Sequence, residues 1–251
     1  MIRASAQIEN VKRRAPFDVF YFYMYALPMS KFTAVIFDLD GLIVDTEPLH
    51  RRAFNLILRA CGAAYEFSAD EYGRIFTGRV IHENAEYVRE RFGLAQNANE
   101  IAEGHRALYN LLIADAENIQ TMPGLMELLA YLGAQNLRVA IASSSRPEQI
   151  HVILRGLKLP RQFDVIVGND GALKPKPAPD VYLRAASQLG VAPAQAIALE
   201  DSHSGVRAAR AAGIAVFAIP NDYTKMQDFS NATAIYPDLN AVREFFSIRA
   251  R

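Results

Sequence analysis

Short apolar runs alternate with longer amphipathic segments along most of the chain. Residues 33–37 are rich in β-branched and aromatic side chains and end at Asp38, which is typical of a buried strand. Similar runs follow at 137–142, 164–167, 196–199 and 214–219. Helical spacing of apolar residues separates most of them, at 125–132, 152–157, 181–189 and 206–212. This alternation predicts an α/β fold whose core is a Rossmann-like parallel sheet flanked by helices.

A long helical segment interrupts the alternation between the first two predicted strands. Roughly a hundred residues there show almost no strand signal. Helical patterns lie near 48–61, 68–76, 81–92 and 99–116. Because this insertion is far longer than a usual crossover connection, we expect most of it to be a separate domain. The predicted division is a core of residues 32–45 and 118–251 and an all-helical cap domain of residues 46–117.

Residues 1–31 differ from the rest and are expected to form a poorly ordered extension. Basic residues precede an aromatic run at 17–25, which is a weak likeness to a targeting leader. Asp18 interrupts this run, no small-residue cleavage pattern follows it, and it is too short to span a bilayer. A cleaved leader and a chain start at Met29 are the alternatives.

The composition indicates a globular protein without affinity for polyanions or membranes. Of 251 residues, 51% are hydrophobic and 22% charged, which is too apolar for a disordered chain and too polar for a membrane bundle. Basic and acidic residues both number 27, so no net charge attracts nucleic acid or anionic lipid. The single cysteine, Cys61, excludes an intramolecular disulfide and fits a reducing compartment such as the cytoplasm.

Two aspartates stand where the first predicted strand ends. In the run Asp38-Leu39-Asp40-Gly41, alternation of side chains places both carboxylates on one side of the strand. Such a run is also an ordinary turn sequence. A calcium-binding loop is excluded, because Ile43 and Leu49 occupy the positions that require glycine and glutamate.

Further polar side chains follow later strands. Ser143, Ser144 and Ser145 come directly after the second strand, Lys176 precedes a helix, and Glu200-Asp201 end the fourth strand. Each has an ordinary alternative role as a helix cap or a solvated loop charge. Together they are expected at one edge of a parallel sheet, where several carboxylates need a cation. Hard oxygen ligands favour Mg²⁺, and the lysine and hydroxyls opposite would hold an anion.

A phosphate monoester is the anion that suits this arrangement, because phosphoryl transfer needs positioning, cations and an in-line nucleophile. Asp38 can supply the nucleophile, since a carboxylate is ionised at neutral pH and needs no partner base. Asp40 can protonate the departing alkoxide and then take a proton from the water that cleaves the aspartyl phosphate.

These motifs resemble those of the haloacid dehalogenase (HAD) superfamily, in its branch with a helical cap after the first strand. The resemblance covers residues 32–246 and places its first motif at 38–47 and its third in 176–180. It implies that Asp38 is the nucleophile and a metal ligand, and that Asp40 is the acid/base, with its backbone carbonyl on Mg²⁺. The remaining roles that it implies are phosphoryl binding by Ser143 and Lys176, and metal binding by Asp201 with Glu200. Because dehalogenating members lack the second aspartate, Asp40 favours phosphate esters.

The resemblance also implies that the cap selects the substrate. Gly78-Arg79 resembles the cap loop that approaches the substrate, so Arg79 is the first candidate for contact with the non-phosphate part. The other candidates are Glu47 and His50, with His82 and Arg106 behind them. A solvated helix charge is the alternative role. The expected substrate is a small phosphorylated metabolite, such as a sugar or polyol phosphate.

Two other functions compete with hydrolysis. A sugar-phosphate mutase of the β-phosphoglucomutase type shares the four core motifs. Mutases of that type carry an arginine at the position of Ile81 and usually alanine at that of Glu47, so hydrolysis is favoured. A non-catalytic phosphate-binding module is the second alternative, since a fold does not settle a function. Intact Asp38 and Asp40 disfavour it.

Overall fold

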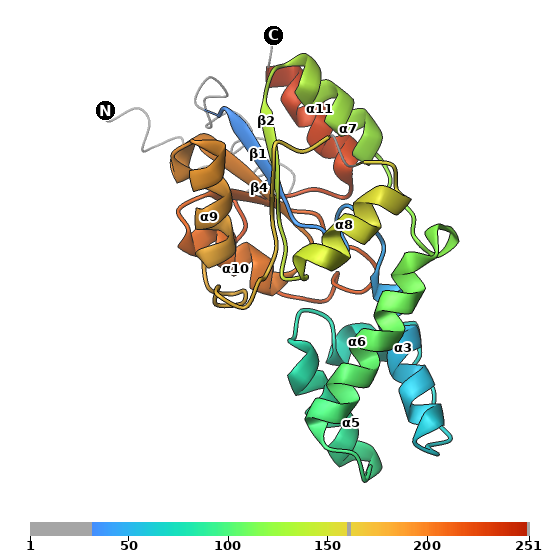
Figure 1. The fold of residues 1–251 in the computed structure, drawn as a ribbon. Coiled ribbons are helices and arrows are strands. Elements are labelled where there is room, and N and C mark those ends of the chain that lie inside the picture. The colour runs from blue at the N-terminus through green and yellow to red at the C-terminus, as the bar shows by residue number, and fades with distance from the viewer. Residues whose placement is uncertain (1–31, 160–161, 250–251) are drawn as a thin grey trace, which may run out of the picture.

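A parallel sheet lies at the centre of the computed structural model, which describes residues 32–159 and 162–249 (Figure 1). Its six strands follow the order β3-β2-β1-β4-β5-β6, and every neighbouring pair is parallel. The strands are β1 (Ala34–Phe37), β2 (Arg138–Ala142), β3 (Val165–Val167), β4 (Ala196–Glu200), β5 (Ala215–Ala218) and β6 (Ala234–Ile235). The predicted α/β fold is confirmed.

Helices cover both faces of this sheet (Figure 1). One face carries α7 (Leu125–Ala134), α8 (Pro147–Gly156) and α11 (Leu239–Arg249), and the other α9 (Asp180–Leu189) and α10 (His203–Ala211). Strand β1 shows why its sequence is continuously apolar. Val35 and Phe37 belong to one hydrophobic cluster, whereas Ala34 and Ile36 belong to the other. Successive side chains point to opposite faces, and both faces are buried.

The insertion after β1 folds into helices that lie beyond the carboxyl ends of the strands (Figure 1). They are α3 (Glu47–Ala60), α4 (Ala69–Ile75), α5 (Ile81–Phe92) and α6 (Ala98–Ala114), followed by a 3₁₀ turn at Ala116–Asn118. This helical segment, residues 47–114, has its own hydrophobic cluster around Phe54, Tyr72 and Phe76. The four predicted helices are present, and the division into two domains stays a prediction.

The chain enters and leaves the helical segment through two stretches that lie side by side. The amide of Asp45 donates to the carbonyl of Gln120 at 3.2 Å, and that of Met122 to Ile43 at 2.9 Å. An antiparallel bridge joins Val44 to Thr121. The helical segment is therefore attached to the sheet by a paired double connection.

The structure adds two elements to those predicted, β6 and α11. The expected extension at residues 1–31, with its aromatic run, lies outside the described residues. In the two described stretches no helix combines the length and the hydropathy that crossing a membrane requires.

Candidate active site

The sheet order brings the predicted polar residues to one edge. Strand β1 lies between β2 and β4, so Asp38, Ser143 and Glu200 follow or end three adjacent strands. The amide of Asp38 donates to Leu199 at 3.0 Å and extends the ladder by one residue beyond β1. The expected strand alternation therefore reaches Asp38 but not Asp40, which lies in the turn that follows.

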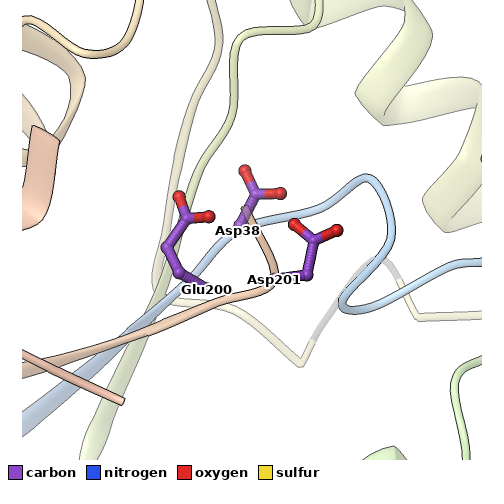
Figure 2. Close-up of side chains that lie close together, drawn as sticks. All are labelled: Asp38, Glu200 and Asp201. Atoms are coloured by element: carbon purple, nitrogen blue, oxygen red, sulfur yellow. The ribbon is translucent and has the colours of Figure 1, made fainter. Parts of the chain in front are cut away.

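Three buried carboxylates gather at this edge. Ligand oxygens of Asp38, Glu200 and Asp201 all lie within 4.8 Å of one another. Figure 2 shows the three carboxylates pointing into the same space from two neighbouring segments of the chain. Their exposed fractions are 6%, 0% and 2%, so water screens their mutual repulsion poorly. The arrangement requires positive charge nearby.

Lys176 supplies part of that charge. Its Nζ donates to Asp38 Oδ1 and to Glu200 Oε1, each at 2.5 Å, and its side chain is 6% exposed. The Tyr182 hydroxyl from α9 donates to the same Glu200 oxygen at 2.5 Å. One ammonium thus serves two carboxylates of the cluster.

Burial is the largest influence on the pKa values of Asp38 and Asp201 in this cluster. It raises the pKa of Asp38 to about 7, against the opposing effect of Lys176. It also raises the pKa of Asp201 well above its usual value, and the charges of Asp38 and Glu200 add to this. Burial alone would lower the pKa of Lys176, but Asp38 and Glu200 together raise it above the usual range. The cluster therefore carries more acidic groups than one lysine neutralises, and its hard oxygen donors fit Mg²⁺.

The carboxylate of Asp40 lies in a ring of hydroxyl groups. Its Oδ1 accepts from Thr46 Oγ1 at 2.8 Å and from the Tyr109 hydroxyl at 3.2 Å. Its Oδ2 accepts from Ser145 Oγ at 2.6 Å and from Ser143 Oγ at 3.4 Å. An ionised carboxylate accepts all four bonds, and uptake of a proton by Asp40 requires one hydroxyl to turn and accept instead.

Asn221, in the loop after β5, fixes the position of Asp201. Its Nδ2 donates to Asp201 Oδ2 at 2.9 Å and to the Gly41 carbonyl at 3.0 Å. Gly41 has φ +81°, and a Cβ there would lie 2.3 Å from the Asp201 carboxylate oxygen. Both the backbone conformation and the close approach explain the glycine after Asp40.

A cavity of about 730 Å³ opens between the sheet edge and the helical segment. The core side contributes Asp38, Asp40, Ser144, Lys176 and Asp201 to its wall. The helical segment contributes the predicted candidates Glu47, His50, Arg79, His82 and Arg106. The space is large enough for a small phosphorylated molecule and is lined by residues from both parts of the chain.

The candidates from the helical segment differ in their surroundings. Glu47 is buried, and burial raises its pKa to about 8, although Thr77 Oγ1 donates to it at 3.3 Å. His50 stacks on the Tyr109 ring at 3.9 Å, and burial lowers its pKa to about 4. Arg79 is exposed and its NH1 donates to the Ile75 carbonyl at 3.2 Å. Glu47 and His50 are therefore neutral groups of the cavity wall near pH 7.

The two predicted serines lie differently. Ser143 is fully buried behind the cavity wall, whereas Ser144 is exposed and lines the cavity. Lys174 is exposed and outside the cavity wall, so the geometry separates it from Lys176.

Several residues at the site were not singled out from the sequence. They are Thr46, Tyr109, Tyr182 and Asn221. Thr46 lies within the first motif, so its position offered a signal. Tyr109 and Asn221 lie 69 and 180 residues from their partners Asp40 and Gly41, and no local pattern marks them.

The chain is similar to known proteins over most of its length. CbbY of Rhodobacter capsulatus is 37% identical, over 83% of this chain and 94% of that protein. A phosphorylated carbohydrates phosphatase of Thermotoga maritima is 33% identical, over 72% and 82%. A β-phosphoglucomutase of Bacillus subtilis is 34% identical, over 72% and 80%.

A solved structure of a relative is also similar to this chain over most of its length. CbbY from Rhodobacter sphaeroides, in complex with xylulose-(1,5)bisphosphate, superimposes with a TM-score of 0.70 at 30% identity and covers 83% of this chain and 95% of that one. Residues 35–219 match the family described as haloacid dehalogenase-like hydrolase. The matched stretch begins within β1, ends after β5 and contains every carboxylate of the cluster. The chain belongs to the haloacid dehalogenase superfamily, in its β-phosphoglucomutase-like branch.

Proposed function

We propose that this protein is a Mg²⁺-dependent phosphatase that hydrolyses a small phosphorylated metabolite through a phosphoaspartyl intermediate. The observation that carries the proposal is the convergence of Asp38, Lys176 and Asp201 on one wall of the cavity. A nucleophile, a cation for the phosphoryl oxygens and acidic metal ligands are the parts that phosphoryl transfer needs. The names of the phosphatase relatives support the same class of reaction.

In the proposed reaction an oxygen of Asp38 attacks phosphorus, and the bond from phosphorus to the ester oxygen breaks. The Lys176 ammonium, 2.5 Å from Asp38 Oδ1, lies where it can also attract a phosphoryl oxygen. Ser144 lines the cavity beside it, while Ser143 supports Ser145 by accepting from its amide at 2.9 Å. We assign direct phosphoryl binding to Ser144 together with Lys176. Ser143, expected from the sequence to bind the phosphoryl group, is buried and is proposed to support the site through Ser145.

Asp40 is assigned the proton transfers. It donates a proton to the departing alkoxide and, once ionised, takes one from the water that attacks the aspartyl phosphate. The hydroxyls of Thr46, Tyr109, Ser143 and Ser145 hold its carboxylate in place. Because each hydroxyl can donate or accept, the ring can accommodate both protonation states of Asp40.

Asp38, Glu200 and Asp201, with the backbone carbonyl of Asp40, are the residues proposed to hold Mg²⁺. When bound, the ion neutralises charge on the carboxylates and the phosphoryl group. The carboxylates of the cluster fit this role. Burial raises the pKa values of Asp38 and Asp201, and the neighbouring acidic groups add to it, so a cation would favour their ionised form.

The substrate is proposed to be a sugar or polyol phosphate. Carbohydrate phosphates appear in the names of the Thermotoga relative and of the ligand in the CbbY structure. The cavity wall offers Glu47 and His50 as neutral hydrogen-bonding groups, which suit hydroxyls of a sugar. Arg79 at the rim is the third proposed contact with the non-phosphate part.

A sugar-phosphate mutase is the second candidate, because a β-phosphoglucomutase is among the relatives. A mutase must return a phosphoryl group to the sugar and exclude water during the exchange. The cap-loop arginine of that type is absent, and Ile81 lies in the cavity wall at its position. This loss of a cation from the cavity favours hydrolysis.

Phosphate release from a panel of monoesters, with and without Mg²⁺, tests the proposal. We expect Mg²⁺-dependent turnover in the wild type and its loss in Asp38→Asn, which is nearly isosteric but a poor nucleophile. Asp222→Asn, an exposed change outside the cavity wall, is the matched control and should retain activity.

Three outcomes would contradict the proposal. Conversion of β-glucose 1-phosphate to glucose 6-phosphate faster than phosphate release, stimulated by the bisphosphate, would identify a mutase. Tight phosphate binding without turnover of any ester would identify a binding module. Undiminished hydrolysis by Asp38→Asn would show that Asp38 is not the nucleophile.

A further inference from the structure

One loop joins the metal-ligand side of the core to the helical segment. It begins after β5 and includes Asn221, whose amide group holds Asp201 and the Gly41 carbonyl. The Asn221 Oδ1 in turn accepts from the amides of Tyr223 and Thr224, at 2.8 and 3.2 Å. The start of the loop is therefore fixed relative to the carboxylate cluster.

The middle of the same loop packs against α4. The rings of Tyr72 and Tyr223 meet edge to face, with centroids 6.2 Å apart. Gly73 lies so close to the loop that a Cβ there would be 2.9 Å from the Tyr223 carbonyl oxygen. Backbone of the core and backbone of the helical segment thus touch directly at this point.

Gln227 completes the connection with both ends of its side-chain amide. Its Oε1 accepts from the amide of His203 at 2.8 Å, at the start of α10 and two residues after Asp201. Its Nε2 donates to the carbonyl of Thr77 at 3.1 Å, in the turn between α4 and α5. Gln227 is half-buried and is not part of the cavity wall.

The turn that Gln227 holds carries much of the rim of the cavity. Thr77, Gly78 and Arg79 all line it, and the Thr77 hydroxyl donates to buried Glu47. The carbonyl of Thr77 is thus fixed to the core by one side chain, while its hydroxyl is fixed to a group of the cavity wall. A shift of this turn would move the proposed substrate contacts relative to Asp38.

We propose that Gln227 is a positioning residue that clamps the Thr77–Arg79 turn of the helical segment onto the start of α10 and so sets the width of the cavity over Asp38. It touches neither the substrate nor the reacting atoms. Its effect on turnover rests on the proposed function, whereas its effect on the position of the helical segment does not.

The test compares two variants of this residue. Gln227→Ala loses both bonds. Gln227→Glu keeps an acceptor for the His203 amide but has no N–H for the Thr77 carbonyl, so it preserves the contact within the core and breaks only the clamp. Met226→Ala is the control, because Met226 is the neighbouring residue and is 82% exposed.

The position of the helical segment relative to the core is measured on the full chain by pulsed electron paramagnetic resonance. Cys61, the single cysteine of the sequence, follows α3 in the helical segment, and Ser187→Cys adds a second label on an exposed position of α9. We expect both Gln227 variants to broaden or shift the distance distribution, and Met226→Ala to leave it unchanged. Unchanged distributions in Gln227→Ala, or a change in Gln227→Ala that Gln227→Glu restores, would overturn the proposal.

Kinetics form the second arm, with the ester that the panel identifies as the preferred substrate. KM should rise about fivefold in both Gln227 variants, the factor that corresponds to one hydrogen bond, with a smaller change in kcat. Wild-type KM in Gln227→Glu would overturn the proposal. If no ester is hydrolysed by the wild type, the proposed function fails, and the distance measurement still decides the clamp.

Discussion

Lys176 shows how much a single side chain can determine at this site. It is buried, it serves two carboxylates at once, and its neighbour Lys174 is exposed. Without the ammonium, Asp38 and Glu200 would remain buried with little to balance their charge, which is strongly unfavourable. Lys176 and Lys174 are two residues apart but differ in burial. Comparing variants of the two measures how much the buried ion pairs of Lys176 contribute to stability.

We expect Lys176→Met to lower the free energy of unfolding by about 3–5 kcal/mol in Mg²⁺-free buffer, the usual cost of breaking a buried ion pair. Lys174→Met should change it by less than about 0.5 kcal/mol, as is typical of exposed positions. Urea unfolding followed by circular dichroism measures both. Equal stability of the two variants would show that the ion pairs of Lys176 contribute nothing net.

Sequence alone identified Lys176 but not the groups around it. The lysine belongs to a local motif, so its spacing to Asp180 could be recognised in one stretch of chain. Tyr182 contacts Glu200 from another element, and Asn221 reaches Gly41 across 180 residues. Such partners follow from the packing of elements, which no local pattern encodes.

At the scale of elements, α3 and α6 pack through three nearly parallel rings. His50 of α3 contacts both Tyr109 and His105 of α6, with ring centroids 3.9 and 5.2 Å away. The centroids of Tyr109 and His105 are 6.2 Å apart, and a hydrogen bond of 3.4 Å joins His50 Nδ1 and His105 Nε2. Burial lowers the pKa of His50 to about 4 and that of His105 well below its usual value. Burial therefore disfavours protonation of both histidines in the folded protein.

This histidine pair predicts a loss of stability in mild acid. A histidine with a lowered folded-state pKa stabilises fully above its unfolded pKa, near 6.5, and loses that contribution as pH falls towards the folded value. For His50, whose folded-state pKa is about 4, the loss between pH 7 and pH 5 is about 2 kcal/mol.

His105→Phe, which keeps a ring but cannot be protonated, should lose less stability than the wild type over this interval, because burial lowers the pKa of His105. His151→Phe, at an exposed position of α8, should behave as the wild type. Urea unfolding at the two pH values measures the difference. Identical acid sensitivity of wild type and His105→Phe would contradict the prediction.

The predicted and unpredicted elements differ in how much local pattern they carry. Residues 34–37 and 196–200 are continuously apolar up to their acidic ends and could be recognised as strands. Strand β6 is only two residues long and pairs at the sheet edge, so it is defined by its partner β5 and not by its own sequence. Helix α11 was not predicted, although its amphipathic pattern is no weaker than that of α7.

For the whole molecule, the carboxylate cluster links metal binding to folding. A cation that binds the folded chain and not the unfolded one stabilises the fold by mass action, by about 2.7 kcal/mol at a hundredfold excess over Kd. We expect the thermal midpoint of the wild type to rise with Mg²⁺ concentration and to fall back when EDTA removes the ion.

Asp201→Asn should weaken this dependence, because the amide offers one neutral oxygen in place of a carboxylate. Asp222→Asn, an exposed position, should keep it. Differential scanning fluorimetry over a Mg²⁺ series compares the three proteins. A thermal midpoint of the wild type that does not respond to Mg²⁺ would show that the ion does not bind at the proposed site.

The paired stretches at residues 43–45 and 120–122 have a consequence for how such a protein can diversify. The two ends of the insertion pair with each other, so the length and sequence of the insertion need not alter the spacing of the strands beneath it. A foreign insert with similarly adjacent ends could be grafted there while β1, β2 and β4 keep their register. Under the proposed function the core carries the reaction and the helical segment the choice of metabolite, so this connection lets one change while the other is conserved.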